Sequence, residues 1–444
     1  MKGILEKIGR DFVIYGLSDA IQRLINFLLL PLYTMTFSPS EYGILEILIV
    51  FGSLLLILFD LGLILAQSFY FYQIGDRAKV VSTVFFLRIL WSFFLLFILY
   101  MLSPFLNTVV FGGIINRTWL FILFFNAMCF AILNQIIEIY RLNFKPLSFF
   151  YMWILFTFFS ISMILFFLFV FKMGLLGYLI GYLIGTIITL GILLWRNREY
   201  IKLHIDKSLM KEFLRFSLPL FPGNLLVFLM TVIDRLLLAK LSNLADLGIY
   251  AVGLKFSMLV YIFSDLFTKS LNPYILSKIK TEEGLRILRD LAGIYVFIVG
   301  AVSVIITVVS PFIIRVWLPE EYFISYKFVG ILCISMSLWG FSYFPSVGLW
   351  KEQKTKFHSF SVIFGLVINI LMNYILIKKI GALGASIAAL AGNICFVIML
   401  SIFSENISGI KLRYRVIITS FVISCILVML IQIFWLNFWS FLTP

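Results

Sequence analysis

IYGLSDAIQRLINFLLLPLY, the stretch Ile14–Tyr33, is long and apolar enough to cross a lipid bilayer. It nevertheless carries an aspartate, Asp19, and an arginine, Arg23. A charged side chain near the centre of a membrane helix costs about 2.5–3.5 kcal/mol on insertion scales. Such residues face other helices or a water-filled cavity. The stretch therefore predicts a membrane helix with a functional polar face.

The composition excludes a soluble enzyme, because 62% of the 444 residues are hydrophobic and only 13% are charged. A net charge of +14 would indicate nucleic-acid binding in a soluble protein. Here the basic residues lie between apolar runs, as topology signals do, so we expect no nucleic-acid partner. We also expect no metal or other cofactor, because the cysteines lie in apolar segments without paired spacing: Cys129, Cys333, Cys395 and Cys425.

Apolar runs of about 20 residues predict thirteen membrane spans. The predicted spans are 12–35, 43–70, 81–104, 117–140, 148–171, 174–195, 213–239, 246–273, 289–312, 326–349, 357–377, 381–403 and 416–440. A basic linker at 196–215 separates the sixth span from the seventh.

The distribution of basic residues orients these spans. With the N-terminus in the cytoplasm, 23 of the 35 lysines and arginines fall in cytoplasmic segments, seven fall outside and five lie within spans. This asymmetry satisfies the positive-inside rule. It predicts a multi-pass protein of the cytoplasmic (inner) membrane with its C-terminus outside.

Two halves of the chain repeat one pattern. Lys172, Gly174, Gly177 and Gly185 match residues 207 positions later, and the segment around Gly43 matches that around Gly248 at an offset of 205. Because each half has an even number of spans, a pseudo-two-fold axis along the membrane normal would relate them. We expect an all-α polytopic membrane protein with six-helix bundles at 1–205 and 206–404, followed by a loop and an extra helix at 405–444.

Polar residues recur along one face of the first span at helical spacing: Tyr15, Asp19, Gln22, Asn26 and Tyr33. Arg23 follows Asp19 by four residues and could pair with it. In the eighth span, Tyr261 and Asp265 lie on a similar stripe, and Lys269 follows Asp265 by four residues. The alternative is that such pairs only lock neighbouring helices together.

The intramembrane charges predict a central cavity that attracts an anion. The candidate cations are Arg23, Arg88, Arg235, Lys255 and Lys269, and the candidate polar or coupling residues are Asp19, Gln22, Asn26, Asp234, Tyr261 and Asp265. Arginine suits phosphate groups because its fork of donors matches their oxygens. For Arg88 an alternative stays open, because this side chain could reach the cytoplasmic surface.

The segments Leu28–Ile47 and Thr231–Lys255, with the glycine-rich sixth and twelfth spans, resemble the polysaccharide transporter family of O-antigen and capsule flippases. This family belongs to the multidrug/oligosaccharidyl-lipid/polysaccharide exporter superfamily. The resemblance implies two six-helix bundles in a V shape and transport of an undecaprenyl-pyrophosphate-linked oligosaccharide from the inner to the outer leaflet. Asp234 and Arg235 match the family's Asp-Arg pair, and Arg23, Lys269 and Lys255 would hold the pyrophosphate.

These observations favour a monomeric flippase that performs alternating access without covalent chemistry. The membrane potential could drive it, and proton or sodium exchange at Asp19 or Asp265 is the alternative. One rival function is multidrug export by the same fold, which we expect to need an acidic or aromatic cavity. A second rival is a membrane enzyme of polysaccharide assembly, but the short external loops lack the acid–base pairs that such an enzyme needs. A third is a scaffold for polysaccharide synthesis, which would not need buried charges.

Overall fold

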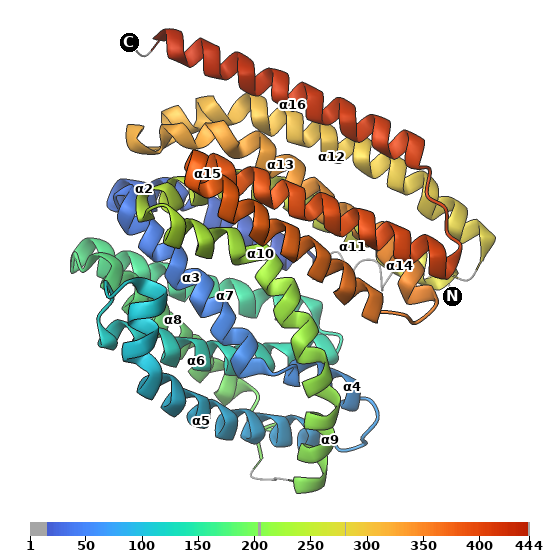
Figure 1. Cartoon of the computed structure of the whole chain (residues 1–444). Helices are drawn as coiled ribbons and strands as arrows, with labels where there is room; N and C mark the ends of the chain where they lie inside the picture. Colours follow the sequence, from blue (N-terminus) through green and yellow to red (C-terminus); the bar gives the residue numbers. More distant parts are fainter. Residues whose placement is uncertain (1–15, 203–205, 280, 443–444) are drawn as a thin grey trace. The chain divides into compact units, whose positions relative to one another are not determined.

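The computed structural model describes residues 16–202, 206–279 and 281–442, and every regular element in these ranges is helical (Figure 1). Residues 16–28 form the first helical segment. The α-helices that follow are α2 (Leu30–Thr36), α3 (Pro39–Asp60), α4 (Leu63–Tyr70), α5 (Arg77–Phe111), α6 (Arg117–Leu142), α7 (Pro146–Leu165), α8 (Gly174–Arg196), α9 (Lys207–Ser217), α10 (Phe221–Leu241), α11 (Leu244–Lys278), α12 (Glu282–Trp317), α13 (Tyr326–Phe341), α14 (Tyr343–Lys351), α15 (Lys356–Ser408) and α16 (Tyr414–Leu442). Short turns of other helix types lie at η1 (Phe166–Val170), η2 (Leu218–Leu220) and η3 (Glu320–Ser325).

Short polar side chains fix where several long helices begin. Asp76 caps α5, Asn116 caps α6, Asn243 caps α11 and Thr281 caps α12, each accepting a hydrogen bond from a backbone N–H of the first turn. Such caps satisfy donors that have no partner inside the helix. The polar segments between the apolar runs therefore set the helix boundaries.

Eleven helical segments among the described residues are long and apolar enough to cross a membrane. The first predicted span begins outside the described residues, and two predicted spans, 357–377 and 381–403, fall within α15.

A straight helix of 53 residues would be about 80 Å long, far more than the roughly 30 Å of a bilayer core. The backbone of α15 leaves helical geometry at Ile380 and Gly381, so this helix is two segments joined at a kink. The arrangement of twelve spans plus one stays a prediction.

The repeated glycines build two similar helical hairpins. Gly174 and Gly381, matched in the sequence, have positive φ angles of 55° and 53° at the two turns. Gly185 lets α8 approach the backbone of Ser160 in α7, since a Cβ there would lie 2.5 Å from the Ser160 Cα. Gly392 plays the same part within α15, where a Cβ would lie 3.0 Å from the Gly365 carbonyl oxygen. The sequence repeat thus has a structural counterpart.

The chain divides into two compact units, which are described separately. Unit 1 comprises Met1–Glu46 and Leu226–Pro444, and unit 2 comprises Ile47–Leu225. The predicted domain boundaries at 205 and 404 rest on the sequence repeat and stay a prediction.

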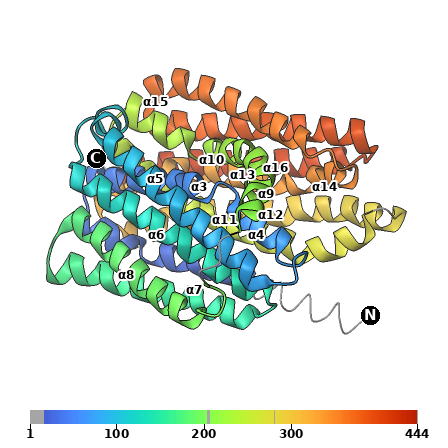
Figure 2. The same cartoon turned by 90° about the horizontal axis from the view of Figure 1, so that it is seen from below.

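In unit 2, the helices α5, α6, α8 and α7 lie side by side in that order (Figures 1 and 2). The predicted basic linker contains an element that the span count did not anticipate, the helix α9. Its Leu209 and Phe213 are buried in an apolar cluster with α4 and α5, while its basic residues stay exposed or half-buried. This helix is therefore amphipathic.

In unit 1, α11, α12 and α13 pack against one another, and α16 covers α12 and α13 (Figure 1). The aromatic side chain of Phe27 in the first helical segment packs on Phe256 of α11, with ring centroids 5.1 Å apart. This contact brings the polar face of the first segment to the polar face of α11.

Candidate functional site

A lysine between two carboxylates forms the centre of the candidate site. The Nζ of Lys269 lies 2.8 Å from the Oδ2 of Asp19 and 2.9 Å from the Oδ2 of Asp265. Asp19 belongs to the first helical segment, and the other two residues are one turn apart on α11. The spacing of Asp265 and Lys269 on one helix predicts the second of these contacts, whereas the contact of Lys269 with Asp19 was not predicted.

These charged groups are solvent-accessible although they lie in apolar helices. The side chains of Asp19 and Lys269 are 44% and 33% exposed. Asp265 lies inside a candidate membrane span, in the helix α11. Because ionised side chains in membrane helices face protein or water rather than lipid, we expect the exposed sides of these residues to face water.

Arg23 does not form the predicted pair with Asp19. Its guanidinium instead lies over the ring of Tyr261, with Cζ 4.6 Å from the ring centroid. The carboxylate of Asp19 turns toward Lys269, a compact charge that fits between two acidic groups, whereas a planar guanidinium stacks on an aromatic face. Within the described ranges no ion pair joins Arg23 to a carboxylate.

Two amides extend the polar face of the first helical segment. Asn26 donates a hydrogen bond to the backbone oxygen of Gln22 over 3.0 Å. The Nε2 of Gln22 is buried and has no hydrogen-bond partner among the described residues. Tyr15, also predicted for this face, lies outside the described residues, and Tyr33 is buried.

A second charged network lies deeper in unit 1. The Nη1 of Arg235 contacts the Oε1 of Glu46 at 2.6 Å, and its Nη2 donates to the backbone oxygen of Thr231. Asp234 accepts a hydrogen bond from the hydroxyl of Tyr250. Glu46 and Asp234 are buried, so this network is largely closed to solvent.

Lys255 joins this second network. It is half-buried and close enough to Glu46 for an electrostatic interaction. The structure therefore sorts the predicted cations of unit 1 into two groups. Arg23 and Lys269 are accessible, whereas Arg235 and Lys255 neighbour a buried carboxylate.

Beside this network, α3 and α11 make backbone contact. A Cβ placed on Gly43 would lie 1.9 Å from the carbonyl oxygen of Leu244, and one placed on Gly248 would lie 1.9 Å from that of Pro39. Neither position can carry a larger residue without moving a helix, so the two glycines are required by this close approach.

Arg88 belongs to unit 2 and is fully buried, so the alternative that it reaches the cytoplasmic surface is wrong. Its Nη2 contacts the Oδ1 of Asp60 at 2.7 Å, and its Nη1 donates to the backbone oxygen of Ala131. Asp60 also accepts hydrogen bonds from the backbone of Gly62 and Ile64 at the start of α4. The pair therefore clamps the break between α3 and α4, beside a cavity of 250 Å³.

The described residues contain no group of three or more histidine, cysteine or acidic side chains that could hold a metal ion. What the site in unit 1 offers is a lysine ammonium group, a guanidinium and two carboxylates. Groups of this kind have the chemistry to bind an anion.

A family model described as "Polysaccharide biosynthesis protein" matches residues 8–280, more than half of the chain. The chain belongs to this family. The predicted resemblance to polysaccharide transporters is thereby confirmed at the family level. The chain is also similar to a protein of Haemophilus influenzae named "Lsg locus putative protein 1", with 24% identity over 345 residues, covering 73% of this chain and 80% of that protein.

Solved structures show the fold that this member of the polysaccharide biosynthesis family adopts. The lipid II flippase MurJ in an inward closed conformation aligns with a TM-score of 0.72 and 19% identity, over 97% of this chain and all of that one. An inward-facing MATE transporter of the MOP superfamily aligns with a TM-score of 0.71 and 15% identity, over 88% and 99%. The predicted all-α polytopic fold, which both of these structures share, is confirmed.

Proposed function

We propose that this family member is a flippase that moves a polyprenyl-pyrophosphate-linked oligosaccharide from the inner to the outer leaflet of the cytoplasmic membrane. Undecaprenyl pyrophosphate is the carrier we expect, and surface polysaccharide synthesis, such as that of O-antigen, is the process. The observation that carries the proposal is the accessible pair of cations, Arg23 and Lys269, on two facing membrane helices.

The pyrophosphate would bind at these two cations. Its oxygens match the planar fork of Arg23, and Lys269 can turn from its carboxylates toward the ligand. Asp19 and Asp265 hold Lys269 in place when the site is empty. Gln22 and Tyr261 would contact the sugar or the phosphates from the same side.

Arg235 and Arg88 act differently in this proposal. Each is bonded to a carboxylate, Glu46 or Asp60, so its charge is largely neutralised. We propose that these two arginines position the helices that carry the transport path, with Lys255 and Asp234 supporting the first of them. Asn26 completes the polar face of the first segment.

Movement of the bound head requires no covalent step in this proposal. Moving an anion out of a negatively charged cell interior is favoured by roughly 2.3 kcal/mol per charge per 100 mV. The membrane potential therefore suffices as a driving force, with proton or sodium exchange at Asp19 or Asp265 as the alternative. The proposed functional form is a monomer.

Multidrug export is the second candidate, because a multidrug resistance transporter shares this fold and two carboxylates lie at the site. A binding measurement separates the two. The purified protein is titrated with inorganic pyrophosphate and, separately, with a lipophilic organic cation. We expect pyrophosphate to bind and Arg23→Ala to weaken it about 30-fold, the loss of one charge-assisted contact of about 2 kcal/mol. Binding of the organic cation alone would favour drug export.

A further inference from the structure

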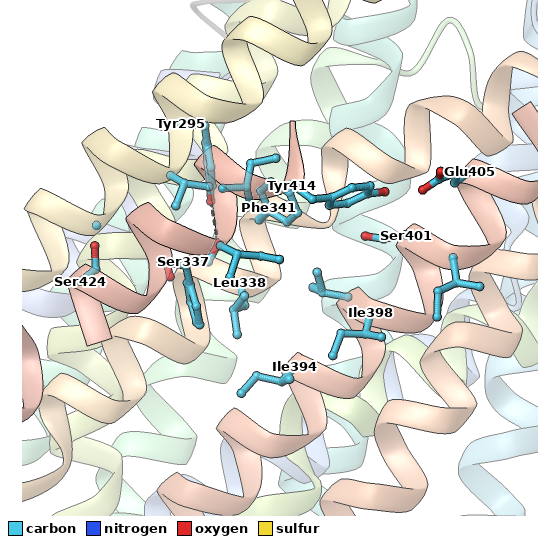
Figure 3. Close-up of a pocket in the computed structure, with 17 residues that line it drawn as sticks. Tyr295, Ser337, Leu338, Phe341, Ile394, Ile398, Ser401, Glu405, Tyr414 and Ser424 are labelled. Carbon is cyan, nitrogen blue, oxygen red and sulfur yellow. Dashed lines mark hydrogen bonds between the residues drawn. The ribbon is translucent and has the colours of Figure 1, made fainter. Parts of the chain in front are cut away.

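A second cavity lies in unit 1 between α12, α13, the second segment of α15, and α16 (Figure 3). Its volume is 490 Å³. Most of its lining is apolar, and Leu338, Phe341, Ile394 and Ile398 are examples. Figure 3 shows that the polar side chains Ser401, Glu405 and Tyr414 gather at one end. The lining also includes Ser337 and Ser424 on the opposite side, but its charged residue, Glu405, lies at this end.

The mouth of this cavity lies between two membrane helices. Ile398 of α15 and Ile418 of α16 both line it and are 52% and 58% exposed. Both helices are candidate membrane spans, so these exposed apolar side chains face the bilayer. A void beside lipid would leave its lining without contact atoms, and a hydrocarbon chain entering from the bilayer restores those contacts.

Basic residues flank the polar end of the cavity. Lys411 and Arg413 lie in the segment that leads into α16, Arg415 lies in its first turn, and all three are exposed. Arg413 pairs with Asp290 of α12 at 2.9 Å. For Lys411 and Arg415, the described part of the chain contains no ion-pair partner. Such basic residues at the end of a membrane helix attract the phosphate of a lipid head group.

The cavity is large enough for a hydrocarbon chain. Its volume of 490 Å³ is many times the ~30 Å³ that a water molecule occupies in the liquid. An acyl chain of a phospholipid can therefore enter it.

The cavity is also separate from the cationic site. Tyr295 lines the cavity, is 1% exposed, and contacts Ser264 and Phe267 of α11. Those two residues lie on the far side of α11 from Asp265 and Lys269. A substrate held at Lys269 would therefore have its head on the other side of this helix.

We propose that this cavity binds one acyl chain of a bilayer phospholipid, with its phosphate at Lys411 and Arg415 and a hydrogen-bond-donating head group at Glu405. The lipid fills the space between α15 and α16 and fixes the extra C-terminal helix to the rest of unit 1. This role is independent of the proposed transport.

Native mass spectrometry of the purified full chain tests the proposal. The protein is stripped of lipid, and phosphatidylglycerol or phosphatidylcholine is added back. We expect one phosphatidylglycerol to bind, and phosphatidylcholine, which lacks head-group donors, to bind about tenfold more weakly. Ile398→Trp should fill the mouth and reduce phosphatidylglycerol binding about tenfold, a change of about 1.4 kcal/mol.

Matched variants control for general effects on membrane helices and charge. Ile375→Trp places the same ring at a site on α15 that is 50% exposed but outside the cavity, and it should bind lipid as the wild type does. Lys411→Glu with Arg415→Glu should weaken binding about tenfold, whereas Lys354→Glu with Lys356→Glu should not. Equal retention by all variants would overturn the proposal, as would absence of bound phospholipid in the wild type. Displacement of the phospholipid by polyprenyl phosphate would overturn it too, since the site would then belong to the substrate.

Discussion

Gly43 and Gly248 pack reciprocally, because each lies against the carbonyl group of the residue four positions before the other. The two glycines are also the matched positions of the sequence repeat, 205 residues apart. Two segments related by a two-fold axis make the same contact twice, once in each direction. Gly43 against Leu244 and Gly248 against Pro39 are such a pair of contacts. The repeat is thus present in the contact between α3 and α11 as well as in the sequence.

Alanine at either glycine should destabilise the protein by a similar amount. A methyl group 1.9 Å from a backbone oxygen cannot be accommodated without moving a helix, and overpacking of this kind costs about 1–3 kcal/mol. Thermal unfolding in detergent would measure this for Gly43→Ala and Gly248→Ala. Gly191→Ala in α8 is the control, since a Cβ there meets no atom within 4 Å. Equal melting temperatures for all three variants would rule out the close contact.

Glycines at the two hairpin turns should both be sensitive to a side chain. Gly174 and Gly381 have positive φ, which costs other residues roughly 1–2 kcal/mol in the left-handed helical region. The ψ of −132° at Gly381 lies outside that region, so alanine should cost more there. Alanine at either position should lower the melting temperature measurably more than Gly191→Ala does. If only one of the two were sensitive, the hairpins would not be structural equivalents.

Of the two residues of the buried ion pair in unit 2, Asp60 should be the more costly to replace. Asp60→Asn leaves the fully buried guanidinium of Arg88 without its carboxylate, and breaking such a pair costs about 3–5 kcal/mol. Arg88→Met should cost less, because Asp60 is 26% exposed and keeps its hydrogen bonds to α4. The comparison pair is the surface contact of Lys79 with Asp206, whose removal should leave the melting temperature nearly unchanged. A larger effect of Arg88→Met than of Asp60→Asn would show that the buried guanidinium does not depend on this carboxylate.

Removing a carboxylate from the cationic site should strengthen anion binding. Asp19→Asn releases Lys269 from one of its two acidic partners, while Asp265 keeps it in place. A unit charge at 4 Å in water is worth about 1 kcal/mol, so the affinity for inorganic pyrophosphate should rise about fivefold. Calorimetric titration can measure this, with Glu320→Gln on an exposed turn as the control. Weaker binding by Asp19→Asn would mean that the aspartate, rather than the lysine, contacts the ligand.

Much of the fold could be predicted from the sequence because apolar runs, glycines and basic segments each reflect a local requirement. The spans could be predicted because a membrane helix must match the thickness of the bilayer. The hairpins of α7–α8 and α15 could be predicted because only glycine fits where the two helix backbones are in contact. The break between α3 and α4 could not be predicted, because Leu61 adopts a positive φ that its residue type does not indicate.

The candidate site was predicted in its residues but not in its pairings. Asp19 and Lys269 are 250 residues apart, so their contact depends on which faces of two distant helices meet. Arg23 was the predicted partner of Asp19 because the two are four residues apart on one helix, and helical spacing says nothing about residues on other helices. For the same reason the burial of Arg88 against Asp60 and Ala131 was not evident, since three separate helices create it.

The most direct test of the central claim is translocation of a polyprenyl-pyrophosphate-linked oligosaccharide in reconstituted vesicles. The wild type is compared with Arg23→Ala, Arg23→Lys and Lys269→Ala, and with Lys354→Ala as an exposed control, after confirming that all fold. We predict transport by the wild type and the control, loss in both alanine variants, and partial activity in Arg23→Lys, which keeps the charge but not the fork of donors. Undiminished transport by Arg23→Ala and Lys269→Ala, or export of a cationic dye with no lipid transport by the wild type, would contradict the proposed flippase mechanism.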